Sequence, residues 1–100
     1  MELENKYDFD GILQNEAEKL VIRELGKQLE PYSSGPICLC EECIIDMAAM
    51  ALNAVKPIYR VSLLGTMYAS QAMADAAYAK SIRMAVAQAI EKIRKNPSHN

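Results

Sequence analysis

All three cysteines of this 100-residue chain fall within one short stretch, spaced as Cys38-x-Cys40-x-x-Cys43. Residues two apart on an extended segment point the same way, and so do residues three apart at the start of a helix. The three sulfur atoms can therefore converge on one point. A helix N-terminus and a bound cation both favour the thiolate, which is the form that ligates metals. The spacing predicts a metal site, with zinc as the default ion for a tetrahedral sulfur site in a reducing compartment.

A tetrahedral site needs a fourth ligand, which the three cysteines do not supply. The candidates are His99, which is the only histidine, Asp46, one turn past Cys43, a water molecule, or a group from another subunit. Two other interpretations of the cysteines stay open. They are common as buried, inert core residues, or they could do redox or nucleophilic chemistry. Nucleophilic catalysis is the weakest interpretation, because a cysteine nucleophile needs a base and the body of the chain has no histidine.

Apolar residues at helical spacing predict three helices around this cluster. The first starts near Leu13, shows an apolar stripe to Leu29, and ends before Pro31. The second starts near Glu41 or Glu42 and ends at Lys56-Pro57, since the residue before proline is disfavoured in a helix. The third runs from about Ser70 to Lys95 and ends at Asn96-Pro97. Residues 58–61 are predicted as a short extended piece that forms no sheet, and residues 62–69 are ambiguous.

The predicted elements make one all-α domain over residues 1–100, a bundle of three to four helices with a long C-terminal helix. Residues 1–10 are predicted to be a loose N-terminal arm, and residues 98–100 a tail. A C-terminal helix of ~26 residues would be ~39 Å long, against a radius of gyration of ~13 Å for a compact domain of this size. Two shorter helices would leave part of its stripe uncovered, so we expect a homodimer. Asn53, a poor helix former within the second helix, is expected to bond the backbone of the chain leaving Pro57.

Composition and charge argue against several classes of function. The net charge is −2, so a global electrostatic grip on DNA is not expected. The longest uncharged run, residues 61–74, is too short and too polar to cross a bilayer. The N-terminus is acidic and has no signal-peptide pattern, which predicts a cytoplasmic protein. Paired carboxylates beside a base and a glycine loop that could cradle a phosphate are both missing from the pattern, so we do not expect an enzyme.

The region from residue 38 to residue 59 resembles the family of the late competence protein ComFB. The residues that carry the resemblance read Cys38-x-Cys40-x-x-Cys43-x-x-Asp46-Met47-x-Ala49-x-Ala51-Leu52-Asn53-x-Val55-x-Pro57-x-Tyr59. The upstream helix, from Asn15 to Leu25, is similar to the first helix of that family, and the resemblance extends over about residues 10–97. Some members carry a further cysteine downstream, whereas this chain has none after Cys43.

This resemblance implies a small all-helical homodimer with cysteine-bound zinc. It also implies an intracellular receptor for a cyclic dinucleotide such as c-di-GMP or c-di-AMP, linked to competence, motility or surface behaviour. Such a ligand brings two phosphates and two purines, which suit arginine forks and a stacking ring. Tyr59, Arg60, Lys80 and Arg83 are the candidates for ligand binding, although each could equally be an ordinary surface charge or a ring at the edge of the core.

Two other functions fit the same residues. The chain could be a structural or protein-interaction module in which zinc only stabilises the fold. It could also be a thiol or metal sensor that uses the three cysteines directly. Titration with cyclic dinucleotides distinguishes a receptor from an interaction module, and reversible metal loss on mild oxidation would indicate a sensor.

Overall fold

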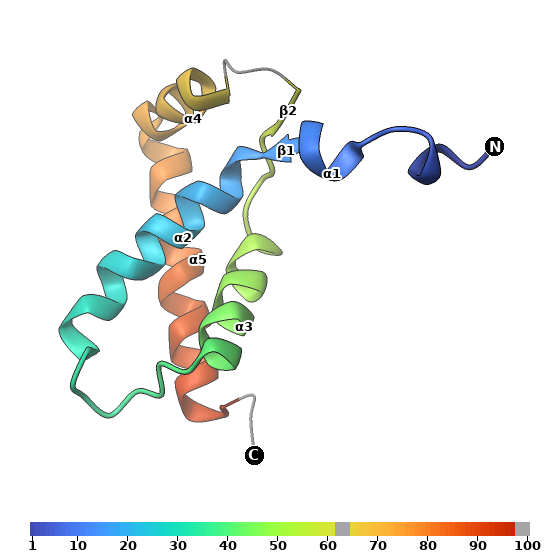
Figure 1. Cartoon of the computed structure of the whole chain (residues 1–100). Helices are drawn as coiled ribbons and strands as arrows, with labels where there is room; N and C mark the ends of the chain where they lie inside the picture. Colours follow the sequence, from blue (N-terminus) through green and yellow to red (C-terminus); the bar gives the residue numbers. More distant parts are fainter. Residues whose placement is uncertain (62–64, 98–100) are drawn as a thin grey trace.

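Four helices make up the body of the molecule in the computed structural model, which describes residues 1–61 and 65–97 (Figure 1). α2 (Glu16–Leu29), α3 (Glu41–Leu52) and α5 (Ala76–Lys95) pack against one another, and α4 (Gly65–Ala74) lies against α2 and α5. The predicted all-α class with a long C-terminal helix is therefore confirmed.

Five short elements complete the chain. They are the 3-10 turns η1 (Leu3–Asn5) and η2 (Glu30–Tyr32), the single-turn helix α1 (Phe9–Ile12), and the strands β1 (Gln14–Asn15) and β2 (Tyr59–Arg60). β1 and β2 pair antiparallel, with Asn15 opposite Tyr59. The prediction that residues 58–61 form no sheet was therefore wrong, because β1 offers this extended piece a partner.

The start of α2 is fixed by one asparagine. The apolar stripe predicted a helix from near Leu13, but Leu13 lies before the helix with 41% of its surface exposed. Asn15 is the N-cap, and its Oδ1 accepts hydrogen bonds from the N–H of Ala17 at 3.1 Å and from the N–H of Ile58 at 2.9 Å. The N–H of Glu16 donates to the Ile58 carbonyl at 2.7 Å. This cluster of bonds joins the start of α2 to the chain that leaves Pro57.

Asn53 was predicted to hold that same stretch of chain. The structure instead makes it the exposed C-cap of α3, with its N–H donating to the Ala49 carbonyl at 3.1 Å. α3 consequently ends at Leu52, before the predicted end at Lys56-Pro57. The bond that we assigned to Asn53 is made by Asn15, from an element far away in the sequence.

Replacing Asn15 with alanine should therefore destabilise the protein more than the loss of a simple cap. The side chain both caps α2 and accepts from Ile58, so we expect the free energy of unfolding to fall by about 2 kcal/mol. Asn53→Ala is the matched control, and should change the free energy of unfolding by less than about 0.5 kcal/mol, as is usual for an exposed site. Urea unfolding followed by circular dichroism measures both changes, and equal losses would contradict this role for Asn15.

The long C-terminal helix is shorter than predicted. One helix was expected from Ser70 to Lys95, but Asp75 separates α4 from α5. Its backbone leaves the helical region at φ −77° and ψ 112°, and its Oδ1 accepts from the N–H groups of Ala77 at 2.9 Å and Tyr78 at 3.4 Å. The carboxylate thus satisfies N–H groups that a new helix would otherwise leave without partners.

α2 and α3 cover the inner face of α5 within one protomer (Figure 1). Its buried residues continue from the first turn to the last: Ala79, Ile82, Ala85, Val86, Ala89, Ile90 and Ile93. The length of this helix therefore gives no reason of its own for a second copy of the chain. On α5, Met84 is exposed by 50%, and the other exposed large apolar side chains of the described residues lie outside this helix, most of them before α2 and one each on α2 (Ile22) and α3 (Ile45).

Tyr78 anchors the first turn of α5 to the loop after α3. Its hydroxyl donates to the Lys56 carbonyl at 2.8 Å, and burial raises the pKa of the phenol. We expect Tyr78→Phe to reduce the free energy of unfolding by about 1 kcal/mol at neutral pH. Because the folded-state pKa is raised, this contribution is complete below the ordinary value of 10.0 and is lost as the pH rises through the folded-state value. Unfolding curves at pH 7 and above pH 10 would test this, and a loss that stays the same at both would contradict it.

Candidate metal centre

The three cysteine sulfurs come together at the foot of α3. Cys38 and Cys40 are half-buried in the segment between η2 and α3, and Cys43 is buried in the first turn of the helix. All three Sγ atoms lie within 4.8 Å of one another. The predicted convergence of the cysteines is therefore confirmed, and the group could hold a metal ion.

Local backbone geometry explains the convergence. Cys40 is the N-cap of α3, with an extended backbone at φ −70° and ψ 161°. Its Sγ accepts from the N–H of Cys43 at 3.4 Å, so the sulfur takes the place that a serine or aspartate oxygen usually fills. Cys38 lies two residues before the cap in a segment without regular secondary structure, and its sulfur reaches the same point.

These three residues fit a sulfur-bound metal ion. Tetrahedral Zn–S bonds of ~2.3 Å put neighbouring sulfurs ~3.8 Å apart, so the group needs only a small contraction from its limit of 4.8 Å. Positive charge at the start of α3 favours the thiolates that ligate metals. Buried Ile37 and Cys43 close the side of the cluster that faces the core.

The other side of the cluster opens onto a hollow of about 460 Å³, lined by Cys38, Cys40, Glu41 and Glu42. The sequence analysis treated the two glutamates only as acidic residues that suit a helix start. Both glutamates line this hollow beside two cysteines, but within the described residues the group that could hold a metal ion consists of the three cysteines and includes neither glutamate. The direct succession Cys40-Glu41-Glu42 is the signal that could have pointed to their place beside the cysteines.

Asp46 and His99, which the sequence analysis named as candidates for a fourth ligand, are not placed in the cluster by the structure. Asp46 is half-buried on α3 but is not part of the cluster of three sulfurs, and it lines a separate hollow with Glu41 and Ile45. His99 lies outside the described residues.

The four predicted ligand-binding residues lie on two separate elements. Tyr59 is exposed and Arg60 half-buried on β2, whereas Lys80 and Arg83 are exposed and about one turn apart on α5. Gln28 of α2 donates to the Arg83 carbonyl at 3.0 Å, which places this part of α5 against the C-terminal half of α2. The structure thus keeps the members of each pair together, and the convergence of the two pairs on one ligand stays a prediction.

A polar hollow that the sequence did not indicate lies between α2 and α4. It measures about 430 Å³ and brings together Glu16, Lys19, Arg23 and Ser70. The Glu16 carboxylate is buried and lies 3.4 Å from the Lys19 ammonium. A carboxylate beside two cations suits a ligand that carries both N–H donors and an anionic group.

Comparison with known proteins identifies the family. The family model described as late competence development protein ComFB matches residues 14–97. This chain belongs to the ComFB family. It is also similar to the solved structure of the late competence protein ComFB from Bacillus subtilis, at 26% sequence identity and a TM-score of 0.65. That match covers 87% of this chain and 93% of the other, and the chain matches no curated protein.

Family membership confirms the resemblance inferred from the cysteine motif. The match to ComFB spans α2 to α5 and includes the cysteine cluster.

Within the described residues, no helix has the length and apolar character needed to span a membrane.

Proposed function

We propose that this ComFB-family protein is a non-enzymatic cytoplasmic receptor for a cyclic dinucleotide, with a structural zinc ion. The observation that carries the proposal is the gathering of three cysteine sulfurs at the foot of α3 in a chain of this family. The resemblance implies both the zinc and the ligand, and a link to competence or motility.

Cys38, Cys40 and Cys43 would hold the zinc ion, and the ion would fix the start of α3 against the core. A chain of 100 residues buries a modest share of its surface, so a metal that ties a loop to a helix adds useful stability. The same geometry suits a structural role better than a catalytic one, because Cys43 faces the core and is closed off from solvent.

Two sets of residues in the structure offer contacts to a cyclic dinucleotide. Arg60, Lys80 and Arg83 can pair with phosphates, and Tyr59 exposes a ring on which a purine can stack. The hollow at Glu16, Lys19 and Arg23 offers a further set of polar groups. A two-fold arrangement of two chains would match the two-fold symmetry of a cyclic dinucleotide.

A second copy would also cover the exposed part of the N-terminal arm, which extends away from the bundle (Figure 1). Six apolar side chains before α2 are exposed: Met1, Leu3, Tyr7, Phe9, Ile12 and Leu13. Apolar groups gathered on one short arm favour a partner that buries them, so we include the homodimer in the proposal. Sedimentation of the full chain against a chain without residues 1–13 tests it, and one monomer mass for both would contradict it.

Isothermal titration with c-di-GMP and c-di-AMP tests the receptor function. We expect one of them to bind with a Kd below about 100 μM, which corresponds to a binding free energy more favourable than about −5.5 kcal/mol. The double variant Lys80→Gln/Arg83→Gln should weaken binding by about tenfold, since it removes charge-assisted contacts to phosphate. Lys92→Gln, on the same helix, is the control and should bind normally. If neither nucleotide binds, the receptor function is wrong for this chain.

The alternative is a protein-interaction module in which zinc only stabilises the fold. One observation favours it, namely a large apolar groove on the outer surface of α2 and α3. A protein with a metal but no nucleotide affinity would support this alternative. A thiol sensor would instead release its metal reversibly on mild oxidation.

A further inference from the structure

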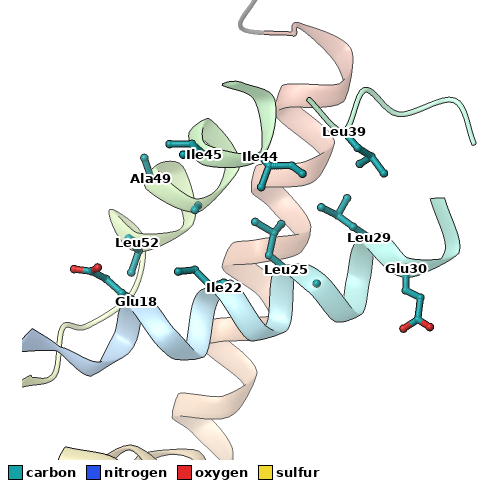
Figure 2. Close-up of a pocket in the computed structure, with 12 residues that line it drawn as sticks. Glu18, Ile22, Leu25, Leu29, Glu30, Leu39, Ile44, Ile45, Ala49 and Leu52 are labelled. Atoms are coloured by element: carbon teal, nitrogen blue, oxygen red, sulfur yellow. The ribbon is translucent and has the colours of Figure 1, made fainter. Parts of the chain in front are cut away.

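A groove of about 820 Å³ lies between α2 and α3 (Figure 2). Leu25 and Leu29 line its buried side, while Ile22 and Ile45 lie on its outer edges with 59% and 60% of their surfaces exposed. The other apolar residues that line the groove are Leu39, Ile44, Ala48, Ala49 and Leu52. A groove lined by aliphatic side chains, with Ile22 and Ile45 largely exposed at its edges, is typical of a binding surface.

Gly26 is a second feature of the groove that indicates a binding surface. It lies in the middle of α2 and lines the groove, and a Cβ atom added there would meet no other atom within 4 Å. Glycine weakens a helix relative to alanine, and here the protomer itself has room for a larger residue. The missing side chain lowers the wall of the groove at its centre, where it allows close approach of another backbone.

Charge defines what the groove would accept. Glu18 and Glu30 line opposite ends of the α2 side (Figure 2), and Glu41 and Asp46 lie beyond Ile45 on the α3 side. Two cations of α2, Lys19 and Arg23, line the polar hollow beside α4 instead, and Lys19 approaches Glu16 at 3.4 Å. An occupant with an apolar stripe and cations at both ends would therefore be complementary to the groove.

The same charges argue against a second copy of this chain as the occupant. If two α2 helices packed antiparallel and crossed midway between Ile22 and Gly26, Glu18 of one copy would lie near Glu30 of the other at both ends of the contact. Like charges that face each other oppose pairing. The groove therefore favours a basic partner over its own copy.

We propose that the groove between α2 and α3 binds an amphipathic helix with basic ends from a partner protein. Glu18 and Glu30 are twelve residues apart, which corresponds to ~18 Å and about three turns of a bound helix. An apolar stripe at helical spacing would pack on Ile22, Gly26 and Ile45, as in other helix-in-groove complexes. This interaction goes beyond the proposed receptor function and does not depend on nucleotide binding.

The metal centre and the groove share a wall. Leu39 lies between Cys38 and Cys40 in the sequence and lines the groove with Leu29 and Ile44 (Figure 2). A metal ion held by the cysteines would fix the backbone on both sides of Leu39. Binding of the partner helix should therefore weaken when the metal is removed.

Fluorescence anisotropy with the full chain and labelled synthetic peptides tests the proposal. The probe is a helical peptide of about 16 residues with leucines at i, i+3, i+4 and i+7 and lysines at both ends. Two control peptides carry glutamates at the ends or the same residues in scrambled order. We expect the basic amphipathic peptide to bind with a Kd below about 100 μM, and at least ~10-fold more tightly than either control.

Three variants locate the contact. Gly26→Leu should reduce peptide affinity by at least ~10-fold while leaving the melting temperature unchanged or higher, because leucine is a better helix former. Glu18→Lys/Glu30→Lys should reverse the preference toward the acidic peptide. Met84→Lys changes an exposed apolar residue on α5 and should bind normally.

Three outcomes would overturn the proposal. The first is equal affinity for all three peptides, and the second is binding that survives Gly26→Leu. The third is a combined result, in which no peptide binds and the protein forms a dimer that Gly26→Leu dissociates. That result would assign the groove to a second copy of the chain. Calorimetry with c-di-GMP on the same samples reports the receptor function separately, so the two proposals can fail independently.

Discussion

Replacing Met47 with alanine is expected to lower the free energy of unfolding by about 3 kcal/mol. Met47 has 0% of its surface exposed and is among the largest fully buried side chains. It points from α3 into the core formed with α2 and α5. Truncation removes contacts in the middle of the bundle, and a helix held by its two ends cannot easily collapse into the space.

Met84→Ala is the matched control for this substitution. Met84 is exposed by 50% on α5, so the same chemical change should alter the free energy of unfolding by less than about 0.5 kcal/mol. Thermal and urea unfolding of both variants measure the difference. If the two variants were equally stable, α3 would not pack on the core as the structure has it.

The helices that the sequence predicted well are those with one clear apolar face. Leu20, Val21 and Leu25 recur at helical spacing on α2, and the structure buries all three. The division at Asp75 could not be seen in the same way, because the alanine-rich pattern continues across it. A helix cap depends on the backbone geometry of one residue, which an apolar period does not report.

The convergence of the three cysteines was predictable because it is local. Cys38, Cys40 and Cys43 lie so close in sequence that helix and strand geometry alone bring their sulfurs together. The groove and the polar hollow are not local. Leu25 and Ile44 line the same groove because α2 and α3 pack side by side. Glu16 and Ser70 line the same hollow because α4 packs against α2. Sequence patterns carry no information about such distances.

The effect expected to be largest is the loss of the metal. Cys43→Ser should reduce zinc content from about one ion per chain to none, since it removes one of three sulfurs. We expect the free energy of unfolding to fall by about 3 kcal/mol or more, which corresponds to a decrease in melting temperature of roughly 12–24 °C. A metal ion bound by the three cysteines would tie the segment before α3 to the helix, and its loss would remove that link between Cys38, Cys40 and the core.

A chelator separates this effect from a simple packing defect. In the unmodified protein a chelator should lower the melting temperature toward that of Cys43→Ser, whereas the variant itself should not respond. Native mass spectrometry counts the metal in parallel. A protein purified without chelator that contains no metal and melts at the same temperature with and without added zinc would show that the cysteines are inert core residues. The start of α3 would then still have the Cys40 cap and the packing of buried Ile37 and Cys43.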